Sequence, residues 1–301
     1  MIGIAEATLL QGFALGLLVL GLAISFRFLD FPDLTVDGSF VLGAATGAHA
    51  IRIGIPVIVA LLMAVGAGFI AGCCTGLLHS RFRLSKLLSG ILMMIALYSV
   101  NFRVMGASNL SLLQSRTLPD YFSHAMGFGT IGVIVFFGFS AICAKIVLDL
   151  ILRSEWGSVL RTVGDNETLA TSLGFSTSRM KIIGLGLANS LVALSGTLVS
   201  QYQGFADISM GIGMIIVGVA SLIIGEAVVQ TLPRRLRGSS IVQRRTTAAL
   251  IGALVYQLIV NVTLRLGIAP TDLKLITALL VIIAVMIGRT REYAFAGIDR
   301  Y

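Results

Sequence analysis

The amino-acid sequence predicts an all-α, polytopic transmembrane bundle of about nine spans, formed by a single domain over residues 1–301. Hydrophobic residues make up 56% of the positions, charged residues make up 12%, and the mean hydropathy is +0.97. A water-soluble domain usually has about a quarter of its residues charged, so a chain this apolar needs membrane lipid as its solvent. The 34 glycines also suit membrane helices, since glycine lets two helix backbones approach closely.

Apolar runs long enough to cross a bilayer recur along the chain. A spanning helix needs about 20 mostly apolar residues. Eight runs meet this criterion, at residues 7–26, 55–79, 85–105, 130–152, 181–203, 209–231, 246–264 and 273–288. A ninth run, residues 37–51, is apolar but short and rich in glycine. Such segments are often re-entrant or broken helices beside a transport pathway.

The basic residues predict the orientation of these spans. No basic n-region or cleavage site precedes residues 7–26, so we expect this run to be retained as a span and not removed as a signal peptide. With the N-terminus outside and nine crossings, sixteen Lys and Arg fall in cytoplasmic segments and five fall outside. This is the positive-inside pattern, and it predicts a cytoplasmic C-terminus. The net charge of +8 belongs to these loops, and no basic stripe with interleaved aromatics indicates a nucleic-acid partner.

Two segments in the first half of the chain weakly resemble two segments in the second half. Residues 34–48 resemble residues 206–225, and residues 84–97 resemble residues 272–285, where a basic residue again precedes a leucine-led apolar run. The members of the second pair would cross the membrane in opposite directions. Inverted repeats of this kind are typical of transporters. The alternative explanation is a shared Leu, Ile and Ala composition.

Glycines spaced four residues apart predict faces of close helix packing. The three sets are Gly12 with Gly16, Gly43 with Gly47, and Gly68 with Gly72 and Gly76.

Residues 153–180 form a polar stretch that the predicted orientation places in the cytoplasm. Asp165 or Asn166 can cap a short helix there, because a side-chain oxygen can accept a hydrogen bond from the first turn. Gly174 can end that helix, since glycine readily takes the left-handed conformation, and Ala170 would let the helix pack closely. On these grounds alone, the stretch either docks on a cytoplasmic partner or is an ordinary amphipathic helix at the membrane surface.

The sequence of residues 157–175, GSVLRTVGDNETLATSLGF, resembles the cytoplasmic coupling segment of the branched-chain amino acid type of ABC importer permeases. The family pattern is roughly G-x-x-x-R-A-x-G-x-N-x-x-x-A-x-x-x-G-I, and it is matched here by Gly157, Arg161, Gly164, Asn166, Ala170 and Gly174. Thr162 and Phe175 stand where alanine and isoleucine are usual. The resemblance extends over about residues 7–288. Within it, residues 185–226 look like those of tryptophan/tyrosine-type ABC permeases.

The resemblance implies a permease subunit of an ABC importer in a bacterial cytoplasmic membrane. Such a subunit forms a homodimer, receives a small solute such as an amino acid from an extracytoplasmic binding protein, and binds no cofactor. An ATP-binding cassette subunit would then dock on the coupling segment, whose candidate residues are Arg161, Gly164, Asp165, Asn166, Ala170 and Gly174. Residues 106–129 would form an exterior loop able to meet the delivering protein.

Signatures of enzymes and of ATP binding are absent from the sequence. No G-x-x-x-x-G-K-[ST] motif occurs, so ATP hydrolysis is expected on a separate partner. His49, His79 and His124 lack metal-ligand spacing, and the three cysteines lie in apolar runs, as buried packing thiols do. No metal or catalytic site is therefore expected.

Polar residues in or beside the spans are candidates for the pathway, because ionisable groups in a membrane usually face a bundle interior. We expect Asp37, Gln201, Gln203 and Asp207 along the transport route, with Asp37 and Asp207 in equivalent places of the two half-repeats. A plain helix N-cap is the alternative role for Asp37. Glu226 is expected to bond between helices or to meet loop arginines.

Two other functional classes remain open from the sequence. An ion- or proton-driven secondary transporter needs intramembrane carboxylates, and Asp37, Asp207 and Glu226 are the candidates. A membrane-embedded enzyme or scaffold is the third reading, although no catalytic motif supports it.

Overall fold

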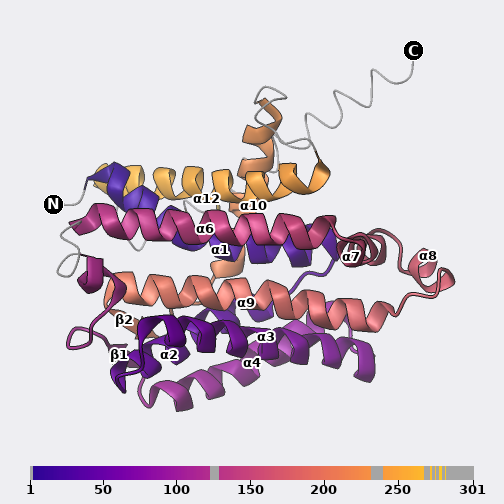
Figure 1. Cartoon of the computed structure of the whole chain (residues 1–301), viewed down its shortest axis with the longest axis horizontal. Coiled ribbons are helices and arrows are strands. Elements are labelled where there is room, and N and C mark those ends of the chain that lie inside the picture. Colours follow the sequence, from indigo (N-terminus) through magenta and orange to yellow (C-terminus); the bar gives the residue numbers. More distant parts are fainter. Residues whose placement is uncertain are drawn as a thin grey trace.

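The computed structural model describes residues 3–122, 129–231 and 240–267, together with the single positions 272, 275, 278, 279 and 282. Long helices pack side by side into one bundle, and α10 crosses the others steeply (Figure 1). The helices are α1 (Ile4–Ala23), the π-helical turn η1 (Ile24–Phe28), α2 (Thr35–Arg52), α3 (Val57–Phe82), α4 (Lys86–Met105), α5 (Leu118–Asp120), α6 (Gly129–Arg153), α7 (Glu155–Asp165), α8 (Glu167–Ser172), α9 (Thr177–Gln203), α10 (Met214–Thr231) and α12 (Ile241–Arg265).

The predicted spans are confirmed in number and approximate position within the described ranges. Seven of the described helices are long and apolar enough to cross a membrane: α1 with η1, α3, α4, α6, α9, α10 and α12. The predicted span at 273–288, and with it most of the repeat segment 272–285, lies outside the described residues. The start predicted for residues 209–231 is wrong, because α10 begins only at Met214.

The middle of the bundle is built around α1 and α9, which are mostly buried. Small residues allow the neighbouring helices to pack closely against α9. A Cβ atom built at Gly72 or Gly43 would overlap a backbone carbonyl of α9, that of Leu185 or Ala193 respectively. The three sets of spaced glycines therefore lie where helices meet: 68, 72 and 76 against α9, 43 and 47 also against α9, and 12 and 16 against α12. Their prediction as packing faces is confirmed.

The chain between η1 and α2 turns back into the bundle. Asp33 is fully buried there, and its carboxylate accepts hydrogen bonds from the Thr35 N–H (2.9 Å) and the Asn189 side-chain amide (2.7 Å). Asn189 lies about 18 Å along α9 from its first residue, so α2 starts near mid-length of α9. From there α2 follows the second half of α9. With 18 residues it is longer than the predicted run 37–51 and as long as α10.

The two ends of the bundle carry different structures (Figure 1). One end carries α7 and α8, and is called the α7–α8 end. The opposite end carries the antiparallel strands β1 (Asn109–Ser111) and β2 (Phe205–Asp207), and is called the β1–β2 end. The first described residues of the chain also lie at the β1–β2 end.

Candidate coupling segment and transport pathway

Local capping divides the polar stretch after α6 into two short helices. The Ser154 hydroxyl accepts from the Gly157 N–H (3.3 Å) and begins α7. The Asn166 side chain accepts from the Leu169 N–H (3.0 Å) and begins α8. Gly174 follows in the left-handed conformation, with φ of 84°. The predicted capped helix is confirmed with Asn166 as its cap, whereas Asp165 is the last residue of α7.

The helix α7 packs on the end of the membrane bundle. Leu160 and Val163 are buried beneath it. A Cβ atom built at Gly164 would overlap the carbonyl of Phe28, so only glycine lets α7 lie this close to η1. The Arg161 guanidinium bonds within α7, to the Gly157 carbonyl (3.3 Å) and the Ser158 hydroxyl (3.1 Å). The close approach at Gly164 fixes α7 on the bundle, while the Arg161 bonds stay within the helix.

The helix α8 has one buried side chain, and exposed apolar residues lie on it and directly after its end. Ala170 is fully buried. Leu169 and Leu173 are 49% and 60% exposed, and Phe175 is exposed as well. Grouped apolar residues on a polar segment are typical of an interaction surface. Leu169, Leu173 and Phe175 are called the α8 apolar surface.

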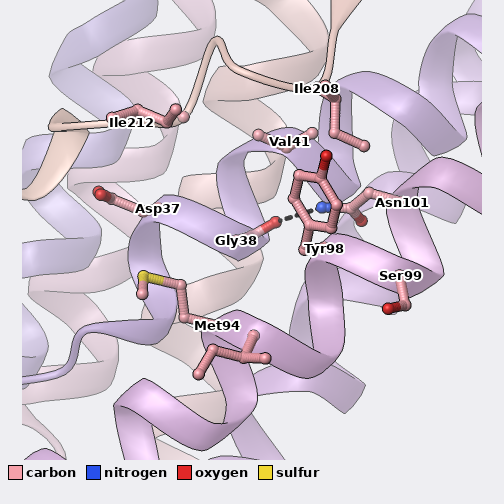
Figure 2. A pocket seen from close by; sticks show the side chains of 11 residues that line it. Asp37, Gly38, Val41, Met94, Tyr98, Ser99, Asn101, Ile208 and Ile212 are labelled. Carbon is pink, nitrogen blue, oxygen red and sulfur yellow. Dashed lines mark hydrogen bonds between the residues drawn. The ribbon is translucent and has the colours of Figure 1, made fainter. Parts of the chain in front are cut away.

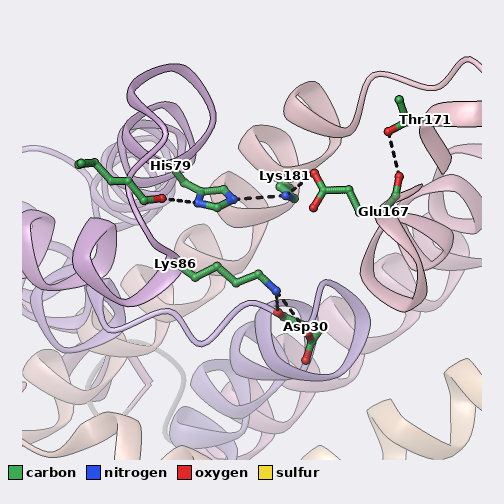
Figure 3. A network of polar contacts seen from close by, with 7 residues as sticks. Asp30, His79, Lys86, Glu167, Thr171 and Lys181 are labelled. Carbon is green, nitrogen blue, oxygen red and sulfur yellow. Dashed lines mark hydrogen bonds and ion pairs between the residues drawn. The ribbon is translucent and has the colours of Figure 1, made fainter. Parts of the chain in front are cut away.

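A chain of polar contacts links α8 to two membrane helices (Figure 3). Glu167, the first residue of α8, forms an ion pair with Lys181 of α9 at 2.7 Å. The Lys181 ammonium also lies 3.2 Å from His79 Nε2 of α3, and His79 Nδ1 bonds the Leu84 carbonyl at 2.8 Å. The Lys181 side chain is 7% exposed, whereas that of Glu167 is 51% exposed.

Lys181 controls the charge of Glu167. Partial burial alone would raise the pKa of Glu167, but the hydrogen bond and the positive charge of Lys181 outweigh burial and lower that pKa below its ordinary value. The ion pair is therefore complete above the ordinary carboxyl pKa and is lost as pH falls through the lowered one. No local sequence pattern predicts these contacts, because His79 and Lys181 lie 102 positions apart.

Asp37 caps a helix other than its own. It lies in the first turn of α2, but its two carboxylate oxygens accept from the Gly213 N–H (3.0 Å) and the Ile215 N–H (2.8 Å), where α10 starts. Asp207 lies in β2 and bonds the Ser209 N–H (2.8 Å) and the Asn109 amide (3.2 Å). The hydrogen bonds from Ser209 hold the pKa of Asp207 below its ordinary value, and the hydrogen bond from Asn109 adds a smaller effect in the same direction. The expectation of equivalent places is therefore wrong.

The predicted pathway residues do not share one cavity. Asp37 lines a cavity of about 430 Å³ between α2, α4 and residues 208–212 (Figure 2). Gln203 lines a separate cavity of about 170 Å³. Gln201 is buried, and its side-chain oxygen accepts from the Leu118 N–H at 3.2 Å. Asp207 lines neither of these cavities.

Glu226 of α10 bonds between helices, which is one of its two expected roles, because its partner Arg27 lies in η1 and not in a loop. Its carboxylate pairs with the Arg27 guanidinium at 2.6 Å. Each of the three carboxylates considered for ion coupling, namely Asp37, Asp207 and Glu226, thus has partners within the protein.

Comparison with known proteins gives the family. The branched-chain amino acid transport system permease component family matches residues 4–286. A tyrosine transport system permease protein of Clostridioides difficile (strain R20291) is 42% identical over 272 residues, which cover 90% of this chain and 87% of that protein. A galactofuranose transporter permease protein of Escherichia coli (strain K12) is 23% identical over 265 residues, covering 87% and 72%.

A solved structure has the same fold. A chain described as an inward-facing conformation of a metal-chelate type ABC transporter superposes with a TM-score of 0.51 and 20% identity, covering 95% of this chain and 85% of that one. The family match spans nearly the whole sequence, and it agrees with the seven apolar helices. This integral membrane chain therefore belongs to the branched-chain amino acid transport system permease family.

Proposed function

We propose that this permease component of an ABC transporter imports an amino acid or a related small solute, driven by ATP hydrolysis on a separate subunit. The observation that carries the proposal is the α7–α8 segment. It is stiffened by caps at Ser154 and Asn166, fixed to the bundle by Gly164 and Ala170, and apolar on its exposed side. A motor subunit needs a firm, protruding element of this kind in order to move the membrane helices.

The six candidate coupling residues divide into three roles in this proposal. Gly164, Ala170 and Arg161 face or bond the permease itself, while Asn166 and Gly174 set the two ends of α8. Asp165 is exposed and free to meet the partner. The main contact with the ATP-binding cassette subunit is the α8 apolar surface, since apolar burial supplies most association energy.

The contacts of Glu167 suggest how motion enters the membrane. A partner that shifts α8 also shifts Glu167, and Lys181 joins Glu167 to α9. Because α9 packs along α2 and α3, its displacement reaches the middle of the bundle. His79 adds a second route, into α3.

The remaining parts of the proposal concern location and partners. The N-terminus and the β1–β2 end face outward from a bacterial cytoplasmic membrane, where an extracytoplasmic binding protein delivers the cargo. The α7–α8 end faces the cytoplasm, in keeping with the sixteen basic residues predicted for that side. Two copies of the chain form the pathway between them. L-Tyrosine is the first cargo to test, since the 42% identical relative is named for it.

Replacing Leu169 and Leu173 together with glutamate is expected to reduce co-purification of the ATP-binding subunit by about tenfold or more. Burying one leucine contributes about 1.5–3 kcal/mol, so losing two such contacts and adding charge exceeds the 1.4 kcal/mol of a tenfold change. The measurement is the ratio of the two subunits after affinity purification from membranes.

The matched control is Leu113→Glu, which makes the same change at an exposed leucine near the β1–β2 end. That variant should retain the ATP-binding subunit. Full retention by the Leu169→Glu, Leu173→Glu variant would contradict docking on α8. Uptake that survives ATP depletion but collapses with an ion gradient would identify a secondary transporter instead.

A further inference from the structure

We propose that the cavity between α2, α4 and residues 208–212 is a cargo-binding site for an α-amino acid with an aromatic or large apolar side chain. In this site the cargo ammonium lies against Asp37. The inference rests on the proposed function, because it gives the transport pathway a binding site and a chemical class of cargo.

The size and the walls of the cavity fit such a cargo. Its volume of about 430 Å³ lies within the range of small-molecule sites. Figure 2 shows Asp37 on one side and Tyr98 with Asn101 on the other. Most of the other lining side chains are aliphatic or thioether groups, namely Val41, Met94, Ile95, Ile208 and Ile212, and Ser99 adds a hydroxyl. An aromatic side chain could be removed from water there, with the Tyr98 ring as a neighbour.

The charge of the cavity favours an ammonium group. Among the described residues that line it, Asp37 is the one charged side chain. Its carboxylate accepts one hydrogen bond from each of two backbone N–H groups. A carboxylate has about four lone-pair sites, so Asp37 has acceptor capacity left for the cargo. A solute carrying only a carboxylate would be repelled.

The same aspartate connects the cavity to α10. Asp37 belongs to α2, yet it holds the first backbone N–H groups of α10. A Cβ atom built at Gly211 would overlap the Asp37 carbonyl, so the chain before α10 lies directly on α2. Cargo that bonds Asp37 therefore binds at the joint between these helices. The Asp37 side chain therefore links the binding of cargo in the cavity to the position of α10.

The second cavity is a poorer candidate. Gln11, Gln203, Met210 and Met214 are among its lining residues, its volume is about 170 Å³, and no charged side chain is among the described residues that line it. It offers an amino acid less space and no counter-charge.

Protection of an introduced cysteine tests the site. The chain has three cysteines, so Cys73, Cys74 and Cys143 are first replaced by alanine and Met94 is then replaced by cysteine. The complex of this permease with its ATP-binding subunit is placed in lipid nanodiscs, and the reaction of the thiol with a charged methanethiosulfonate is timed. L-Phenylalanine and 2-phenylethylamine should each slow the reaction about fivefold at four times their Kd. 3-Phenylpropionate, which lacks the ammonium, should not slow it.

Two variants separate the site from a general effect of ligand. Gln203→Cys reports on the smaller cavity and should not be protected. Asp37→Asn combined with Met94→Cys should lose protection by phenylalanine. If Asp37→Asn disturbs α10 and fails to fold, the comparison of 2-phenylethylamine with 3-phenylpropionate on the Met94→Cys protein still decides the role of the ammonium.

The outcomes distinguish this inference from the proposed function. Equal protection by 3-phenylpropionate, or protection of Gln203→Cys in place of Met94→Cys, would overturn the assigned site. Unprotected Met94→Cys in a complex that still imports amino acids with ATP would also overturn it and leave import standing. Protection with the expected ligand preference in a complex that imports no amino acid would support the site and refute import.

Discussion

Replacing Gly72 with leucine is expected to prevent most of the protein from folding in the membrane. A Cβ atom at this position would overlap the backbone carbonyl of Leu185, and that carbonyl can move only if α9 moves. Overpacking a dense core costs about 1–3 kcal/mol, and a backbone obstacle places this change at or above the upper figure. The yield of monodisperse protein, measured by size-exclusion chromatography after detergent extraction, should fall about tenfold or more.

The matched control lies six residues earlier in the same helix. Gly66 is exposed, and a Cβ atom built there meets nothing within 4 Å. Gly66→Leu should therefore give the wild-type yield, since leucine favours both the helix and a lipid environment. Equal losses from the two substitutions would contradict the packing of α3 on α9 through Gly72.

Replacing Glu167 with glutamine is expected to destabilise the protein more than replacing Lys181 with methionine. The first change leaves a buried ammonium without its counter-charge, whereas the second leaves a half-exposed carboxylate that can turn to water. An unpaired buried polar group destabilises a protein by about 1–3 kcal/mol. Because Glu167 is half exposed, we expect the loss of stability in Glu167→Gln to lie toward the lower figure. Thermal unfolding midpoints of the purified variants measure the difference.

The double variant separates stability from the transmission of motion. Glu167→Gln with Lys181→Met leaves no buried charge at this point, so the unfolding midpoint should recover. Uptake driven by ATP should nevertheless stay low, because the ion pair that joins α8 to α9 is gone. Full recovery of both quantities would restrict the ion pair to a stabilising role. Equal destabilisation by the two single changes would contradict the burial seen for Lys181.

The sequence predicted the spans well, because about 20 apolar residues in a row have few other uses in a protein. It placed their ends less well. The helix α9 begins at Thr177 and α12 begins at Ile241, ahead of the predicted 181 and 246. Charged and polar residues ended the predicted apolar runs, but a helix can continue beyond the lipid when its first turn is capped, as Ser240 caps α12.

The late start of α10 had no local signal. Residues 208–213 are apolar and glycine-rich enough to be counted with the span. Their path is set by Asp37, whose carboxylate accepts a hydrogen bond from the Gly213 N–H. These two residues lie 176 positions apart. A single sequence does not reveal a contact of that separation.

The difference between local and long-range contacts also explains which parts of the candidate sites could be predicted. The shape of α8 depends on bonds between residues three or four apart, such as Asn166 with Leu169, so spacing rules predict it. The ion pair of Glu167 with Lys181 and the cavity at Asp37 depend on how distant segments pack. The sequence predicts Asp37, Gln201, Gln203 and Asp207 together along the transport route. Of these four, Asp37 alone lines the cavity between α2 and α4, and the other three lie elsewhere.

The short strands β1 and β2 join the loop that follows α4 to the chain that precedes α10. Their backbones pair from Asn109 with Asp207 to Ser111 with Phe205, and the Ile208 N–H extends the pairing to the Ser108 carbonyl at 2.9 Å. Ile208 also lines the cavity beside Asp37. A displacement of the loop that follows α4 is therefore transmitted to the cavity wall through these backbone hydrogen bonds, without a tilt of the helices.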